Sequence, residues 1–143
     1  LESVRVFSVS STDDFFQVIQ SLEEVIIDNN IKCIIIDSIA AIVRREFDTN
    51  SLVQRQSTLG KQAAMLKTLA ENFNIPILVT NQVTTSRTPL SFLSGSSKSK
   101  VTNTIAALGT AWAHSVNTRL ILQHYKDDVN MITIAKSPIS PVL

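Results

Sequence analysis

The sequence has too little cysteine, too few long apolar runs and too little net charge for several classes of protein. Cys33 is the only cysteine among 143 residues, so a disulfide framework is excluded and a reducing, intracellular compartment fits best. No apolar run approaches the ~18–20 residues that a membrane-spanning helix needs, and no basic segment followed by an apolar stretch indicates a secretory signal. The formal net charge is +1, so any contact with nucleic acid has to come from local clusters of basic residues.

The three glycines, Gly60, Gly95 and Gly109, do not form a phosphate-binding loop of the type G-x-x-x-x-G-K-[ST]. Gly60 is followed by Lys61 and Gln62, without the Ser or Thr, and lies inside a predicted helix. In such a loop the backbone N–H groups surround the phosphates. We therefore expect this segment, by itself, not to bind or hydrolyse ATP appreciably.

The residues that are present indicate one globular domain. Apolar residues make up 44% of the sequence and occur along its whole length, which is typical of a chain with a core. A length of 143 residues is enough for one domain and too short for two ordinary ones. Because the chain starts at Leu1, in the middle of an apparent strand pattern, we expect it to be a piece of a longer protein.

Hydrophobic periodicity predicts that strands and helices alternate along the chain. Strands are expected at 3–9, 31–37 and 77–79, and a short helix or turn at 39–47. A first helix is expected to be capped within 10–12 and to end at 28–30, and a long amphipathic helix to run from Leu52 or Leu59 to Phe73, where Asn74 closes it. The Ser- and Thr-rich stretch 84–104 predicts a mobile loop, and 116–123 with 130–135 predict a hairpin. This order indicates an α/β fold over 1–143, with a mostly parallel sheet flanked by helices and a C-terminal β-hairpin. The β-branched run at 31–37 further predicts a strand buried on both faces.

Polar side chains follow two of the predicted parallel strands. Asp37 comes directly after Ile34-Ile35-Ile36, and its carboxylate would lie at the carboxyl edge of the sheet, where it could hold Mg²⁺ through water. Gln82 follows the strand at 77–79, where its amide could sense a terminal phosphate. Both have a plainer alternative, because an aspartate that caps a helix and an amide that caps a strand end are common.

Six segments carry a more specific signal when they are taken together. They are IIIDS at 34–38, RREF at 44–47, LAENFNIP at 69–76, TNQV at 80–83, AALGTAWAHSVNTRL at 106–120 and AKSP at 135–138. With these motifs the chain resembles the RecA-type recombinases, in particular the eukaryotic strand-exchange protein and its paralogues, among which the B type is the most similar. The resemblance covers nearly the whole sequence. It implies a partial RecA-like P-loop ATPase core, from which the P-loop portion and the catalytic glutamate are absent.

The resemblance also implies roles for individual residues. Asp37 and Ser38 would border ATP and its Mg²⁺, and Gln82 would sense the γ-phosphate. DNA-binding loops would lie between Arg44 and Arg55 and at about 83–105. The candidate contacts to DNA phosphates are Arg44, Arg45, Arg55, Arg87, Lys98 and Lys100. The alternative for each of these basic residues is a solvated surface charge.

Three further positions match parts of the family that lie near a neighbouring subunit. Lys136 and Pro138 fall in a segment that packs over the neighbour's ATP, and Lys136 stands where the main recombinase has an acidic residue. A cation there could contact phosphate in trans, or it could be an exposed lysine at the end of a strand. His114 matches a position near the nucleotide across the subunit interface, and its alternative is a polar surface residue.

The function implied by the resemblance is DNA repair by homologous recombination. The chain would belong to an ATP- and DNA-binding paralogue that joins other paralogues and supports assembly of the strand-exchange filament in the nucleus. Its partners would be single-stranded or branched DNA, other recombinase paralogues and the strand-exchange recombinase, with no membrane. The alternative is a non-catalytic binding or assembly subunit, or a truncated remnant without ATPase activity.

Overall fold

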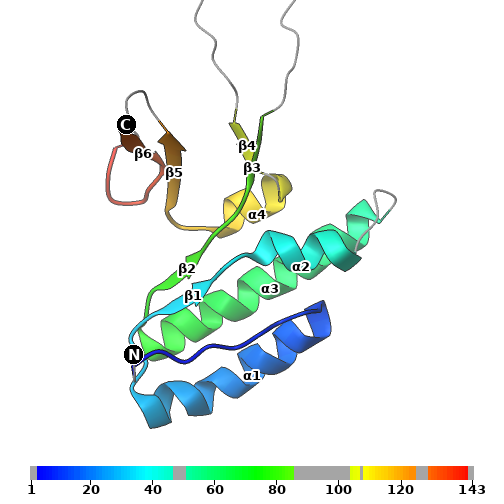
Figure 1. Ribbon diagram of the computed structural model, residues 1–143, viewed down its shortest axis with the longest axis vertical. Helices are drawn as coiled ribbons and strands as arrows, with labels where there is room; N and C mark the ends of the chain where they lie inside the picture. Colours follow the sequence, from blue (N-terminus) through cyan, green and yellow to red (C-terminus); the bar gives the residue numbers. More distant parts are fainter. Residues whose placement is uncertain (1–2, 47–50, 86–103, 107, 125–128, 142–143) are drawn as a thin grey trace, which may run out of the picture.

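A computed structural model describes residues 3–46, 51–85, 104–106, 108–124 and 129–141. Its elements follow the order α1 (Thr12–Asn29), β1 (Ile34–Ile36), α2 (Ile39–Glu46), α3 (Leu52–Phe73), β2 (Ile77–Val79), β3 (Val83–Thr85), β4 (Thr104–Ala106), α4 (Gly109–Ser115), β5 (Arg119–His124) and β6 (Asn130–Lys136). Figure 1 shows the long helices α1 and α3 running side by side, with β1 and β2 next to them. The hairpin β5–β6 lies at the other end of the described structure, beyond α4.

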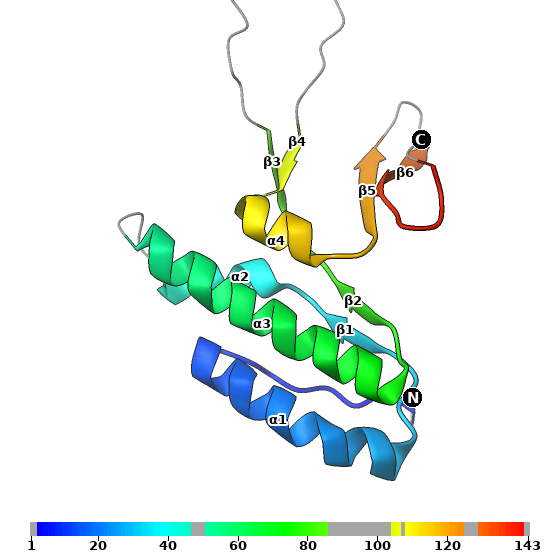
Figure 2. The same cartoon turned by 180° about the vertical axis from the view of Figure 1, so that it is seen from behind.

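Local sequence sets both ends of α1, as predicted. The side chain of Ser11 accepts a hydrogen bond from the backbone N–H of Asp14 at 3.0 Å, which satisfies one of the unpaired N–H groups of the first turn. Asn30 ends the helix in the left-handed conformation, with φ 51°. The buried face of α1 consists of Phe15, Ile19, Leu22 and Ile26 at helical spacing. Figure 2 shows α1 from behind, alongside α3.

The parallel ladder consists of β1 and β2, in which Ile35 pairs with Leu78. Ile34, Ile36, Ile77 and Val79 pack against the helical core. Ile35 and Leu78 point to the opposite face, where they are 66% and 53% exposed. The prediction of a strand buried on both faces is therefore wrong, because the described helices cover only one face of this pair.

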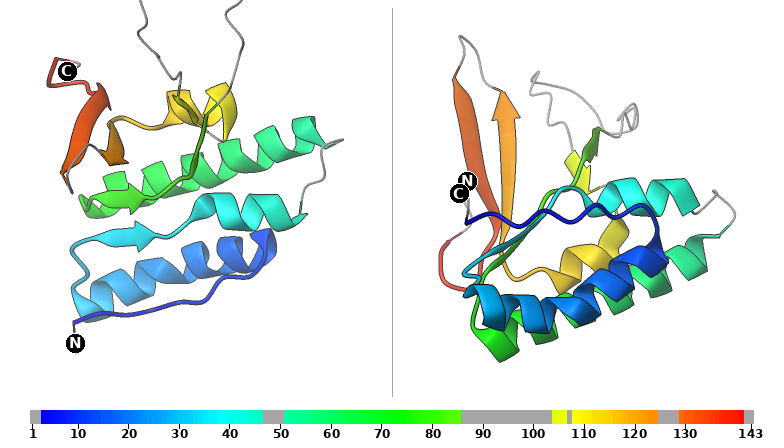
Figure 3. Two further views of the ribbon diagram at one scale, coloured as in Figure 1. Left: turned by 45° about the horizontal axis from the view of Figure 1, so that its top comes forward. Right: turned by 60° about the horizontal axis from the view of Figure 1, so that its bottom comes forward.

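The segment before α1 is not a strand, which corrects the prediction for 3–9. A strand is defined by backbone pairing, and no strand in the described ranges pairs with this segment. Instead it runs in extended form along α1, as both views in Figure 3 show. The guanidinium of Arg5 holds it there by donating two hydrogen bonds to Oδ1 of Asn29, at 3.1 and 2.9 Å.

The second half of the chain contains two antiparallel pairs. β5 and β6 form the predicted hairpin, with Leu122 opposite Ile132. β3 and β4 pair across the stretch that we predicted to be a loop, so its two ends are ladder residues, and 86–103 lie outside the described residues. The predicted class is confirmed as a mixed α/β fold with a parallel pair flanked by helices and a C-terminal antiparallel hairpin.

Helix α4 was not predicted, and it is held on α3 by two buried side chains, Leu108 and Trp112. It begins at Gly109, whose φ of +82° is strained for any other residue. A Cβ at this position would also lie 2.8 Å from Nε2 of Gln56 on α3. In the part of the chain that the structure describes, no helix is both long and apolar enough to cross a membrane.

Candidate functional site

The carboxyl ends of β1 and β2 meet at one edge, because the two strands are parallel. The backbone N–H of Thr80 donates to the carbonyl of Ile36 at 3.0 Å and so continues the ladder one residue beyond β2. The hydroxyl of Thr80 donates to Oδ1 of Asp37 at 2.6 Å. The side chains of Asp37 and Thr80, which follow the two parallel strands, are therefore in direct contact.

The residues around this contact are fixed on both sides. Ser38 is half-buried and leads into α2, whose Ile39 and Val43 are completely buried. Asn81 follows Thr80, and its Oδ1 is buried without a hydrogen-bond partner in the described structure. Gln82 is exposed at the same edge and immediately precedes β3. The exposed carboxylate of Asp37 and the exposed amide of Gln82 thus lie beside residues that the core holds in place. The residue before Gln82, Asn81, has a buried amide oxygen.

This edge has the donor chemistry that a magnesium ion prefers. Its side chains offer the carboxylate of Asp37, the hydroxyl of Ser38 and the amide oxygen of Asn81, all of them oxygens. Among the described residues no group of three or more His, Cys, Asp or Glu could hold a metal ion. One carboxylate fits an ion held mainly by water and by phosphate oxygens, and it does not fit a cage built from protein carboxylates alone.

A second cluster of polar contacts lies at the carboxyl end of α4. The ammonium of Lys136 donates to the carbonyls of Val116, His114 and Ala113, at 2.6, 3.1 and 3.4 Å. Arg119 donates from Nη2 to the carbonyl of Ala113 at 2.7 Å. Two cations therefore bind the carbonyls that a helix leaves unpaired at its negative end. We call Lys136 and Arg119 the α4 clamp.

Comparison with known proteins identifies the chain. The Rad51 family model matches residues 1–142. The chain belongs to the Rad51 family. It is 43% identical over 155 residues to human "DNA repair protein RAD51 homolog 2", an alignment that covers 96% of this chain and 40% of that protein.

More distant relatives agree with this assignment. The Arabidopsis thaliana protein of the same name is 36% identical over 98% of this chain and 40% of its own length. "DNA repair and recombination protein RadA" of Methanococcus maripaludis is 34% identical over 79% of this chain and 33% of its own. The resemblance to a RecA-type recombinase paralogue of the B type is thereby confirmed. The chain spans about 40% of the length of the RAD51 homolog 2 proteins that it matches.

The structure describes little of the basic residues that the Rad51 resemblance marks as DNA contacts. Arg55 lies in the first turn of α3 and is half-buried. Arg44 and Arg45 lie near the end of α2, and their side chains are outside the description. Arg87, Lys98 and Lys100 lie outside the described residues altogether. The DNA contacts remain predictions.

The three positions predicted to lie near a neighbouring subunit fall close together. His114 is exposed in the last turn of α4, and its backbone carbonyl accepts a hydrogen bond from Lys136. Pro138 is exposed two residues beyond, in a bend in which the hydroxyl of Ser137 accepts from the N–H groups of Ile139 and Ser140 at 3.2 and 3.0 Å. Lys136 thus binds within its own chain, a role that the sequence pattern did not suggest.

Sequence reasoning also missed a bridge at the end of α2. One carboxylate oxygen of Glu46 accepts from the backbone N–H of Thr12 at 2.6 Å, and the other accepts from the Thr12 hydroxyl. Thr12 is the first residue of α1, so the bridge satisfies an N–H that the helix itself leaves unpaired. The only signal in the sequence was a glutamate among basic residues, which does not reveal a partner 34 positions away.

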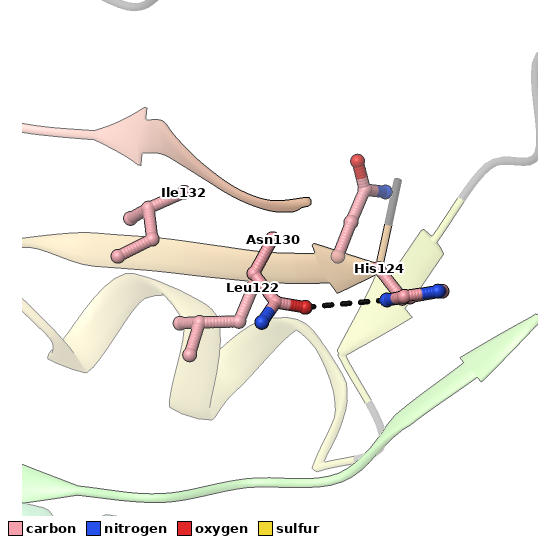
Figure 4. A pocket seen from close by; sticks show the side chains of 5 residues that line it. Leu122, His124, Asn130 and Ile132 are labelled. Carbon is pink, nitrogen blue, oxygen red and sulfur yellow. Dashed lines mark hydrogen bonds between the residues drawn. The ribbon is translucent and has the colours of Figure 1, made fainter. Parts of the chain in front are cut away.

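A hollow on the hairpin contains none of the predicted site residues. Leu122, Gln123, His124, Asn130 and Ile132 line it. Figure 4 shows that Nδ1 of His124 faces Oδ1 of Asn130, at 3.3 Å, while Leu122 and Ile132 form the apolar part. The hollow lies on a different sheet from the one that Asp37 follows, and no Lys, Arg, Asp or Glu lines it, so it is not the predicted phosphate-binding edge.

Proposed function

We propose that this chain forms the C-terminal part of the ATPase core of a recombinase paralogue that acts in DNA repair by homologous recombination. Membership of the Rad51 family supports the proposal, as do relatives named DNA repair and recombination proteins. Its partners in this proposal are other recombinase paralogues, the strand-exchange recombinase, and single-stranded or branched DNA. The compartment is the nucleus, and the outcome is assembly of the strand-exchange filament.

The contact between Thr80 and Asp37 is the single observation that carries an ATP site in this proposal. It brings a carboxylate and a polar strand end to the edge where open α/β sheets bind ligands. A bound Mg²⁺ would supply positive charge that offsets the negative charge of the phosphate oxygens. Asp37 would hold it through water, with Ser38 beside it, once a P-loop is supplied from outside this sequence.

Gln82 is proposed to report the γ-phosphate to the DNA-binding region. Only residues 80–82 separate β2 from β3, so a displacement of the Gln82 amide reaches β3 directly. β3 and β4 are in turn the two ends of the predicted second DNA-binding loop. Basic residues in that loop would bind the DNA backbone, and affinity should fall steeply with salt.

His114, Lys136 and Pro138 are proposed to lie at the boundary with a neighbouring subunit. For Lys136 to contact phosphate in trans, its ammonium must leave its three carbonyl partners, which lie in the last turn of α4 and at the residue after it. We therefore propose an exchange, in which Lys136 holds α4 in the isolated chain and turns to phosphate when a nucleotide-bearing neighbour docks. Such an exchange replaces partial negative charges with full ones.

A second candidate function is a non-catalytic subunit that contributes an interface and DNA contacts. Such a subunit needs surface contacts only and does not need a phosphate-binding loop. The two candidates differ in one requirement, because only the ATPase needs the Asp37 carboxylate.

Complementation in the source organism separates the two candidates. Cells that lack the gene should become sensitive to agents that break or crosslink DNA, and the natural gene product should restore resistance. Asp37→Asn should fail to restore it if the ATPase is needed, and should succeed if the protein only binds. Asp28→Asn, an exposed substitution near the end of α1, is the matched control. A gene whose loss leaves DNA repair intact would overturn both candidates.

A further inference from the structure

Thr80 stands out because it is fixed at both its backbone and its side chain. Its N–H extends the parallel ladder by binding the carbonyl of Ile36 at 3.0 Å. Its hydroxyl lies 2.6 Å from Oδ1 of Asp37 and 3.5 Å from the carbonyl oxygen of Ile36. A hydroxyl has one proton to donate, and the shorter distance assigns that proton to the carboxylate. Sequence reasoning gave Thr80 no role of its own.

The contact restricts a carboxylate that would otherwise turn freely. Asp37 is exposed, so the packing of neighbouring side chains does not fix its orientation. The bond from Thr80 occupies Oδ1 and leaves Oδ2 to accept from another group. Residues that orient a metal-binding carboxylate in this way commonly change metal affinity without touching the metal.

The same residue also joins the two strands that carry the predicted site. Thr80 lies directly after β2 and binds the residue directly after β1. Gln82 is two residues further along the same chain segment. Thr80 therefore connects Asp37 to Gln82 through one hydrogen bond and two residues of backbone. A change at Thr80 should therefore disturb the carboxylate first and the amide second.

We propose that Thr80 is the positioning residue for Asp37: its hydroxyl orients the carboxylate so that Oδ2 is presented to the hydrated Mg²⁺ of a bound nucleotide. The inference rests on the proposed function, since it needs a nucleotide at this edge. Thr80 acts only through Asp37 and makes no contact of its own with the ion.

The test is a magnesium titration of nucleotide binding by the natural gene product, followed with a fluorescent ATP analogue in the absence of turnover. Thr80→Val keeps the shape and the backbone N–H and removes the hydroxyl. It should raise the Mg²⁺ concentration at half-saturation by about 3- to 10-fold, the range expected for one hydrogen bond to a charged group in contact with solvent. Thr80→Ser keeps the hydroxyl and should stay within about twofold of the wild type.

Two controls separate positioning from a general effect on folding. Thr68→Val removes an exposed threonine hydroxyl that donates to the carbonyl of Ala64 within α3, at 3.1 Å, and should leave the titration unchanged. In an Asp37→Asn background, Thr80→Val should have little further effect, because the group that it orients no longer binds the ion in the same way. Rescue by Thr80→Ser keeps the test valid if Thr80→Val lowers stability.

Three other outcomes would refute either the positioning role of Thr80 alone or the proposed ATP site together with it. Equal half-saturation for wild type and Thr80→Val would refute the positioning role and leave the proposed function standing. Equal losses for Thr80→Val and Thr80→Ser would show that packing and not the hydroxyl matters, and would refute it as well. Nucleotide binding by the wild type that is absent or independent of Mg²⁺ would overturn the proposed ATP site, and this inference with it.

Discussion

Replacing Lys136 with methionine should loosen the carboxyl end of α4 while leaving α1 and α3 unchanged. Methionine keeps an unbranched side chain of similar length and removes the ammonium. The variant loses three hydrogen bonds to carbonyls, at 2.6, 3.1 and 3.4 Å, of which the longest exceeds the usual range and contributes least. Because α4 and β6 are joined through this group, the loss should appear in both elements.

The expected magnitude follows from the exposure of the group and from the helix end. A hydrogen bond to a charged group contributes roughly 1.5–3 kcal/mol when it is shielded, and a cation at a helix end contributes about 0.3–1 kcal/mol when exposed. Lys136 is half-buried, so we expect a loss of about 1–2 kcal/mol in the local opening free energy of α4. Arg119→Met should lose less, because it removes one bond, at 2.7 Å.

Amide hydrogen exchange in the natural gene product is the direct assay. In Lys136→Met, a peptide that covers 109–118 should exchange about 5- to 30-fold faster, and peptides from α1 should not change. Lys67→Met, which removes an exposed lysine from α3, is the matched control. Because both cations bind the carbonyl of Ala113, the double variant of the α4 clamp should be non-additive. Unchanged exchange in α4 would refute the clamp.

Three further predictions test contacts that hold helices α1, α2 and α4 in place. Gly109→Ala should lower the free energy of unfolding by about 1–3 kcal/mol in urea titrations, and a gain in stability would contradict this. The reason is that alanine is strained at this positive φ, and its Cβ would lie 2.8 Å from Nε2 of Gln56. Glu46→Gln should lower the free energy of unfolding by about 1 kcal/mol in the same assay, because it weakens the charged bridge to Thr12. An unchanged free energy of unfolding would refute this contribution of the bridge. Hydrogen bonds from Ser10 and Ser11 lower the pKa of Asp14 below 3.8, so its contribution to stability is present above that pH and is lost as the pH falls through the lowered value. Asp14→Asn should therefore flatten the acid limb of a stability profile for α1, and an unaltered acid limb would refute the assignment.

The parts of the fold that local chemistry controls were predictable from the sequence. Both ends of α1 and the carboxyl end of α3 follow from Ser11, Asn30 and Asn74, because capping depends on residues within one helical turn. The hairpin β5–β6 followed from two apolar runs around a polar turn. The position of Asp37 at a carboxyl edge followed from the strand before it, since parallel strands end together.

The parts that depend on distant partners were not predictable. Residues 3–9 alternate like a strand but have no pairing partner among the described residues, and alternation alone does not create a ladder. Ile35 is a β-branched apolar residue of the kind that buried strands contain. It is exposed because the described helices cover only the face that carries Ile34 and Ile36. The roles of Thr80 and Lys136 each depend on an acceptor 20 or more positions away, and nothing in the local pattern identifies it.

The most direct test of the central claim is ATP turnover by the natural gene product, with and without single-stranded DNA. We expect measurable turnover that DNA stimulates, a loss of at least about 100-fold in Asp37→Asn, and wild-type turnover in the control Asp28→Asn. Turnover that survives Asp37→Asn undiminished would contradict the assignment of the carboxyl edge of β1 and β2 as the nucleotide site.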